Sequence, residues 1–302
     1  MTTRAYPPPG LPDWGRCGVM GILNVTPDSF SDGGHWLDAG LAVERGLALV
    51  AEGADLVDVG GESTRPGARR VPEAEELDRV IPVIRELARQ GVLVSVDTMR
   101  ASVAEAAVQA GARIVNDVSG GQADPAMAKA VARTGVPFVV MHWRGQSTEM
   151  DRLTEYGDGD LVAEVLGEVE RQLDAAVAAG VDPAQIIVDP GLGFAKTREH
   201  DWALLAELDA WSVLGRPLLV GPSRKRFLGE LLADPATGEP RPARARDDAT
   251  AASAVLAAAQ GAWAVRVHEV RASADAVRVE AELRARRLAA GQLRSGRSGE
   301  RG

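Results

Sequence analysis

Eight short apolar segments recur along the chain, each followed by a polar or glycine-rich cluster and then by a segment with helical character. Strands that are buried on both faces are expected to be apolar throughout. The predicted strands cover residues 19–25, 55–59, 92–98, 113–119, 137–143, 185–191, 217–223 and 263–268. Strands that alternate with helices indicate a parallel sheet, and eight such units predict an α/β fold, the closed (β/α)₈ TIM barrel. A doubly wound open sheet is the alternative.

The length of the chain is consistent with a single domain. A barrel of about 250 residues fits within the 302 residues present. We expect the barrel to occupy residues 17–288, after a flexible proline-rich lead at 1–16 and before a disordered tail at 289–302. Helices are predicted over 38–52, 72–90, 101–110, 160–179, 201–208, 226–232, 247–260 and 273–288, with a further helix that opens at Asp124 as its N-cap.

Composition argues against several classes of partner. The net charge is −9, from 34 basic and 43 acidic residues, which disfavours a nucleic-acid partner. No uncharged apolar run approaches the ~18 residues of a membrane span, so no membrane partner is expected. Prolines replace the apolar helix of a signal peptide, and the single cysteine, Cys17, cannot form an internal disulfide. These features predict a cytoplasmic protein.

Polar residues at the ends of apolar strands mark the expected site, because a TIM barrel carries its active site at the C-terminal ends of the strands. Asp97, Asn116 and Asp189 each end such a strand. A buried polar group needs a partner, and these donors and acceptors suit the edge of a flat heterocycle. For any one of them, bonding to the backbone of the barrel is an equal alternative. Three of them on separate strands favour a ligand.

Cations follow the last two predicted strands. Ser223 is followed by Arg224, Lys225 and Arg226, and Arg266 and His268 share one face of the eighth strand. The loops after strands seven and eight are the recurrent phosphate site of this fold, so we expect an anion site there rather than a solvated basic surface.

Other strand-end features are weaker signals. The amide oxygen of Asn24 suits Mg²⁺ shared with a phosphate, although one asparagine alone is little evidence for a metal. The glycine-rich segment 60–68 contains Arg65, which could clamp an anion, but taken alone it is more typical of a surface loop. The segment 26–34 fits either a mobile lid or a solvent loop. His142, at the end of the fifth strand, is a lower-ranked candidate, because a histidine packed in the core would give the same pattern.

Seven motifs occur in order along the chain: GILNVTPDSFSDGG, DVGGESTRPGA, SVDT, IVNDVSG, DPGLGFAK, GPSRKRF and VRVH. Together they resemble the dihydropteroate synthase family of folate biosynthesis, over residues 19–278. The resemblance implies a transferase that condenses 6-hydroxymethyl-7,8-dihydropterin diphosphate with 4-aminobenzoate to give 7,8-dihydropteroate and diphosphate. It also implies Mg²⁺, sulfonamide inhibitors that compete with 4-aminobenzoate, and a homodimer.

The resemblance further implies a role for individual side chains. Those expected to be catalytic are Asp32, Arg65, Asp97, Asp189 and Lys225. Those expected to bind the pterin are Asp97, Asn116, Met141, Asp189, Lys225 and Arg266. Those expected to hold the diphosphate are Asn24, Thr64, Arg266 and His268, with Asn24 also on the metal. Those expected to form the 4-aminobenzoate pocket are Phe30, Arg65, Pro66, Phe194, Ser223 and Arg226.

One position departs from the commonest family pattern, since Arg226 stands where many members have serine. An arginine is also able to bind the carboxylate of 4-aminobenzoate. Two other functions compete with the synthase. A methyltetrahydrofolate methyltransferase-like enzyme needs no diphosphate site, so the cations after strands seven and eight argue against it. A non-catalytic pterin-binding paralogue is disfavoured by the intact first and second loops.

Overall fold

The computed structural model describes residues 6–26, 35–62, 70–146, 148–157 and 159–299. The strands are β1 (Gly18–Asn24), β2 (Leu56–Gly60), β3 (Val94–Asp97), β4 (Ile114–Asp117), β5 (Phe138–Met141), β6 (Ile186–Asp189), β7 (Leu219–Val220) and β8 (Ala264–Val267). The α-helices are α1 (His35–Glu52), α2 (Glu73–Arg89), α3 (Ala101–Ala110), α4 (Met127–Thr134), α5 (Leu161–Ala178), α6 (Arg198–Ala206), α7 (Arg226–Leu231), α8 (Asp247–Ala259) and α9 (Val270–Gly299). Short 3₁₀ turns are η2 (Met150–Arg152), η3 (Pro183–Gln185), η4 (Leu208–Leu214) and η5 (Ala243–Arg246).

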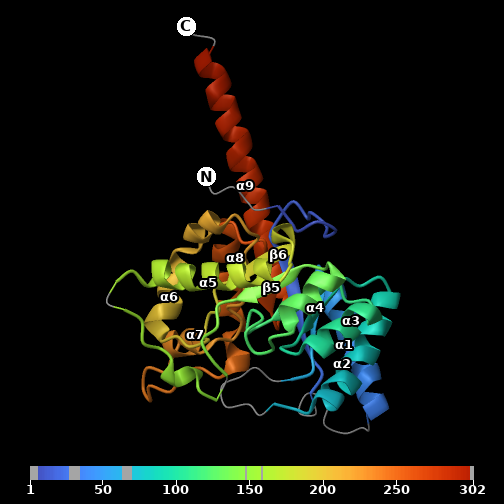
Figure 1. Cartoon of the computed structure of the whole chain (residues 1–302). Helices are drawn as coiled ribbons and strands as arrows, with labels where there is room; N and C mark the ends of the chain where they lie inside the picture. The colour runs from blue at the N-terminus through green and yellow to red at the C-terminus, as the bar shows by residue number, and fades with distance from the viewer. Residues whose placement is uncertain (1–5, 27–34, 63–69, 147, 158, 300–302) are drawn as a thin grey trace.

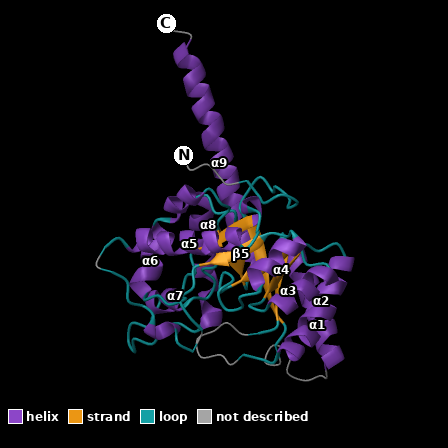
Figure 2. Ribbon diagram, in the orientation of Figure 1, coloured by secondary structure: helices purple, strands orange, loops and turns teal. Residues whose placement is uncertain are grey.

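All the strand pairs are parallel, and the sheet order is β6-β5-β4-β3-β2-β1-β8-β7. A parallel bridge between Val188 and Leu218 joins β6 to β7 and brings the two edges together. The backbone N–H of Val188 also donates to the Pro217 carbonyl at 2.9 Å. The helices surround the strands, as Figures 1 and 2 show. The predicted TIM barrel is therefore confirmed, and the open doubly wound sheet is wrong.

The alternation of side chains along each strand separates two cores. The outward side chains pack under the helices in one large apolar cluster that includes Val57, Val96 and Val115. The inward side chains fill the lower part of the barrel and include Met20, Leu56 and Ile187. Higher in the barrel, the same inward rows become polar. The C-terminal mouth of the barrel therefore gathers Asp58, Asp97, Asn116 and Asp189, which are buried polar side chains of these rows.

Register places the polar side chains of neighbouring strands at one level. Asn24 lies opposite Gly60, Gly60 opposite Asp97, and Asp97 opposite Asn116. A Cβ on Gly60 would stand 3.4 Å from the Cβ of Asp97, so glycine leaves room for the carboxylate. Parallel pairing thus gathers residues that are far apart in sequence on one rim.

Local chemistry sets several helix ends. The Asp160 carboxylate accepts from the backbone of Val162 and Ala163 and caps α5. Helix α3 ends at Gly111, whose φ of 118° is costly for other residues. Helix α4 begins at Met127 rather than at the predicted Asp124 cap. Asp124 instead accepts from Ala126 and, across the loop, from the first N–H of α3 at Ala101.

The chain ends differ from the expected lead and tail. Helix α9 continues to Gly299, so the disordered tail expected from residue 289 is wrong for 289–299. Its alanine, leucine, glutamate and arginine residues are strong helix formers, and Arg286 pairs with Glu282 one turn away. Residues 6–16 have no regular helix or strand, but they are anchored. Trp14 packs against Trp263 and Arg16 forms an ion pair with Asp55. No described helix is both long and apolar enough to span a bilayer.

Candidate active site

Four side chains meet inside the mouth of the barrel, from β2, β3, β4 and β8. Arg266 donates from Nε to Asp58 Oδ2 and from Nη2 to Asp97 Oδ2, each at 2.7 Å. Asn116 Nδ2 also donates to Asp58 Oδ2, at 2.8 Å. The Oδ1 atom of Asp58 is buried without a hydrogen-bond partner. A buried carboxylate oxygen of this kind is costly unless a ligand donates to it, so this cluster is built to accept N–H groups.

Burial controls the charge of this cluster. Burial raises the pKa of Asp97 to about 7, opposed by the charge of Arg266 and reinforced by Asp58. On β6, burial raises the pKa of Asp189 to about 6, although the Gly191 backbone N–H donates to its Oδ1 at 2.7 Å. Two carboxyl groups that titrate near neutrality in one cleft are typical of functional sites.

A lysine faces these acids from the loop after β7. The Lys225 side chain is only partly covered, yet desolvation lowers its pKa to about 8 against the favourable charges of Asp201 and Asp189. Its Nζ lies 4.2 Å from the centre of the Phe194 ring. Gly193 makes this approach possible, because a Cβ there would lie 2.9 Å from the Lys225 side chain. Lys225 therefore places a cation between the acidic side chains of the site and the ring of Phe194.

The rim carries the remaining residues proposed from the sequence. Ser223 Oγ lies 2.9 Å from His268 Nδ1, which links the loops after β7 and β8. Asn24 is half-buried at the end of β1. Met141 is buried at the end of β5, in register with Asp189. These positions surround the cluster of acids and Arg266.

Some predicted site residues are elsewhere or outside the described residues. Arg226 begins α7, pairs with Glu230 on the same helix at 2.7 Å, and has 83 % of its side chain exposed. The structure therefore does not bring Arg226 together with Phe194 and Ser223. Five other predicted residues lie outside the described residues: Phe30, Asp32, Thr64, Arg65 and Pro66.

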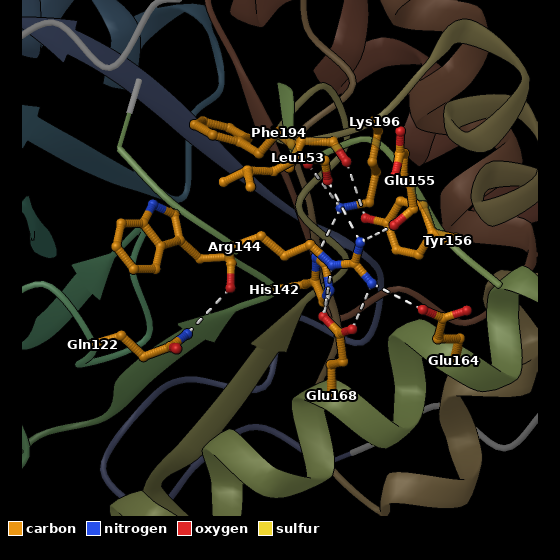
Figure 3. A network of polar contacts seen from close by, with 12 residues as sticks. Gln122, His142, Arg144, Leu153, Glu155, Tyr156, Glu164, Glu168, Phe194 and Lys196 are labelled. Carbon is orange, nitrogen blue, oxygen red and sulfur yellow. Dashed lines mark hydrogen bonds and ion pairs between the residues drawn. The ribbon is translucent and has the colours of Figure 1, made fainter. Parts of the chain in front are cut away.

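Sequence reasoning did not assign three charged residues that the structure places at the site: Asp58, Lys196 and Asp201. For Asp58 a signal existed, since its two-residue spacing from Gly60 puts both on the inner face of β2. Asp201 Oδ1 accepts from the Gly193 backbone at 2.6 Å, a contact across a loop that spacing does not predict. Lys196 binds the ring of His142, and Figure 3 shows this pair within a wider polar network.

The donor set limits the kind of metal the site accepts. In the described ranges, no group of three or more histidine, cysteine, aspartate or glutamate side chains is arranged to hold a metal ion. Mg²⁺ commonly takes one or two protein oxygens and completes its shell with water and substrate phosphates. The half-buried amide oxygen of Asn24 fits a metal of that kind.

Comparison with known proteins relates this site to a family. Residues 20–268 match the model of a family described as pterin binding enzyme. The chain is 59 % identical over 262 residues to dihydropteroate synthase from Mycobacterium leprae, covering 86 % of this chain and 91 % of that one.

Solved structures of dihydropteroate synthases are similar to this chain in fold and sequence. Xanthomonas albilineans dihydropteroate synthase with 4-aminobenzoic acid superposes with a TM-score of 0.81 at 45 % identity, covering 89 % of this chain and 94 % of that one. Yersinia pestis dihydropteroate synthase in a sulfonamide drug complex gives 0.84 at 41 % identity, covering 93 % and 99 %.

Proposed function

Because the chain belongs to the pterin binding enzyme family, we propose that it condenses 6-hydroxymethyl-7,8-dihydropterin diphosphate with 4-aminobenzoate. The products are 7,8-dihydropteroate and diphosphate, and the enzyme is a transferase of folate biosynthesis. The observation that carries this proposal is the polar layer at the barrel mouth, where Arg266 donates to Asp58 and Asp97 and Asn116 donates to Asp58.

These groups are suited to the pterin ring. Asp97, Asp189 and the unpartnered Oδ1 of Asp58 accept hydrogen bonds, and Asn116 also has acceptor capacity. A reduced pterin carries several N–H donors along one edge, so the acids bind that edge and Met141 lines the surroundings. Lys225 donates to a ring oxygen or nitrogen, and Arg266 lies against the pterin.

The reaction needs no protein nucleophile. The bond between the pterin methylene carbon and the diphosphate oxygen breaks, and its electron pair leaves on diphosphate. The amine of 4-aminobenzoate supplies the pair for the new C–N bond and then loses a proton. The carboxylates of Asp97 and Asp189 favour the positive charge that develops on the pterin, and His268 and Arg266 favour the leaving anion.

Asn24 would hold Mg²⁺ together with the diphosphate. The metal supplies charge stabilisation to the leaving group. Thr64 joins the diphosphate site in this proposal, and the loops that carry Asp32 and Arg65 exclude water while the methylene carbon is reactive.

The second substrate occupies the outer part of the cleft. We assign its pocket to Phe194 and Ser223 with Phe30, Arg65 and Pro66, and we expect sulfonamides to compete there. The Yersinia pestis enzyme forms a sulfonamide drug complex. Arg226 serves the carboxylate only if its side chain leaves Glu230, since the two are paired in this structure. A homodimer and a cytoplasmic location complete the proposal.

Diphosphate release tests the function directly. Purified protein is incubated with dihydropterin diphosphate and Mg²⁺, with and without 4-aminobenzoate, and both diphosphate and dihydropteroate are measured. We expect stoichiometric formation of both products only when 4-aminobenzoate is present. Pterin binding without product would identify a non-catalytic paralogue, and methyl transfer from methyltetrahydrofolate would identify the methyltransferase alternative.

A further inference from the structure

His142 lies at the centre of a polar network beside the proposed site. It follows β5 and is fully buried. Its Nε2 lies 2.8 Å from Glu168 Oε2 on α5, and its Nδ1 lies 2.9 Å from Lys196 Nζ (Figure 3). The Glu168 carboxylate accepts and cannot donate, so the Nε2–H group of His142 donates to Glu168 and Nδ1 of the neutral ring accepts from Lys196. Burial lowers the pKa of His142 to about 4, which keeps the ring neutral at physiological pH.

The second hydrogen bond of Lys196 lies within its own loop, the one after β6. Its Nζ donates to the Phe194 carbonyl at 3.0 Å, and the next carbonyl, of Ala195, accepts from the Tyr156 hydroxyl at 3.0 Å. Ala195 has a φ of 49°, a left-handed conformation that is unfavourable for alanine. Two consecutive carbonyls are therefore held by side chains, one by Lys196 from within the loop and one by Tyr156 from outside it, at the point where the backbone is strained.

Glu168 contacts the two side chains that orient Lys196 and Tyr156, the donors to these carbonyls. Its Oε2 accepts from His142, and its Oε1 accepts from Arg144 Nη2 at 2.6 Å. The guanidinium carbon of Arg144 lies 3.7 Å from the centre of the Tyr156 ring. One carboxylate thus orients both the histidine that holds Lys196 and the arginine that stacks on Tyr156.

The loop held in this way carries Phe194, whose ring lies 4.2 Å from Lys225 Nζ. We propose that Lys196, oriented by His142 and Glu168, is a positioning residue that fixes Phe194 for the second substrate. The inference rests on the proposed function, in which Phe194 lines the 4-aminobenzoate pocket. The pterin acceptors Asp97, Asn116 and Asp189 lie on strands, so their positions do not depend on this support, although the charge of Lys196 lowers the pKa of Asp189.

Steady-state kinetics of the full chain tests the proposal with two variants, Lys196→Met and Tyr156→Phe. Lys196→Met should raise the KM for 4-aminobenzoate about tenfold, equivalent to about 1.4 kcal/mol, because the Phe194 carbonyl loses its side-chain donor. Tyr156→Phe removes only a hydroxyl and should cause a smaller rise. The KM for dihydropterin diphosphate should change less than the KM for 4-aminobenzoate in both variants.

The matched control breaks a partly buried ion pair at the opposite end of the barrel. Asp55→Asn weakens the pair with Arg16, whose Nη1 lies 2.7 Å from Asp55 Oδ2. Asp55→Asn should lower thermal stability without changing either KM, as expected for the loss of a purely structural contact. Unchanged affinity for 4-aminobenzoate in both test variants, or equal rises in the two KM values, would overturn the positioning role.

Hydrogen exchange provides a readout that does not need turnover. The amides of residues 193–195 should exchange faster in Lys196→Met than in the unmodified chain or in Asp55→Asn. Equal exchange in all three proteins would overturn the inference even if the enzyme is active. An unmodified chain that forms no dihydropteroate would contradict the proposed function, and the exchange rates would still decide whether Lys196 fixes the loop.

Discussion

At the residue scale, the orientation of one side chain separates a site residue from a structural one. Asn116 and Asp117 are neighbours on β4, but Asn116 faces the barrel and bonds to Asp58. Asp117 faces outward and accepts from the backbone of Ser119 and Gly121. Adjacent strand residues point to opposite sides, so two similar polar residues contribute to different functions.

Replacing Lys225 should impair catalysis more than folding. Lys225→Met removes the cation that faces Asp189 and Phe194, and it should lower kcat/KM for dihydropterin diphosphate by roughly 10- to 100-fold, the range expected for a lost charged hydrogen bond. Lys129→Met is the control, because Lys129 is exposed on α4. Near-normal turnover of Lys225→Met would contradict the assigned role.

The pH dependence of kcat/KM should be bell-shaped. The raised pKa of Asp97, about 7, means that its acceptor form is lost as the pH falls through that value. The lowered pKa of Lys225, about 8, means that its cationic form is lost as the pH rises through that value. Because kcat/KM reports groups of the free enzyme, a pH profile of this parameter measures both limbs. A flat profile between pH 6 and about 9 would exclude these two groups as the essential pair.

At the element scale, the strands position the acids and the loops position the groups that approach them. The loop after β6 is the clearest case, since it contains left-handed Gly191 and Gly193 as well as Ala195. Gly193 leaves space for Lys225, and a Cβ on Gly191 would collide with the His142 carbonyl oxygen. Backbone conformation therefore sets how closely β5, β6 and β7 can present their functional groups.

Two glycine substitutions separate backbone strain from steric collision. Gly135, at the end of α4, has a φ of 68°, and a Cβ there would meet no atom within 4 Å. Gly135→Ala should therefore cost only about 1 kcal/mol, the cost of a left-handed alanine. Gly191→Ala, at a φ of 66°, should cost about 1–3 kcal/mol more because it also displaces the His142 backbone.

Denaturant unfolding measures both stabilities, and kcat/KM should fall only for Gly191→Ala. Equal effects of the two substitutions would show that the close approach between these loops is unimportant.

At the scale of the whole molecule, the barrel and the end of α9 are separate structural features. Over residues 270–290, where the burial of side chains is described, the buried side chains of α9 lie in its first three turns and include Val270, Ala274 and Val277. Residues 281–290 contain no buried side chain, and Figure 1 shows the end of α9 projecting away from the strands. The described part of the barrel core therefore takes its side chains from the beginning of this helix.

Removal of residues 289–302 should leave the melting temperature and kcat/KM unchanged, because the buried side chains described on α9 all lie at or before Glu280. Val277→Ala in the full chain is the contrasting variant, since Val277 is fully buried and its truncation should cost about 2 kcal/mol. Calorimetry and the diphosphate assay compare the two proteins. A large loss of stability on truncation would show that the projecting part of α9 supports the fold.

The sequence by itself determined the alternation of strands and helices, the barrel class, and the polar residues at the strand ends. These follow from local patterns of apolar residues, which can be recognised in the sequence without information about tertiary contacts. It also identified Asp97, Asn116 and Asp189 as a group, because parallel strands end at one face.

Only the tertiary structure decided which of these polar groups pair with one another. The bond between Arg266 and Asp58 joins residues 208 positions apart, and it exists because β8 and β2 flank β1 in the closed sheet. The contact of Lys196 with His142 and the outward direction of Arg226 likewise depend on loop geometry and side-chain rotamers. Such contacts are set by packing across the whole barrel, and periodicity along the chain carries no information about them.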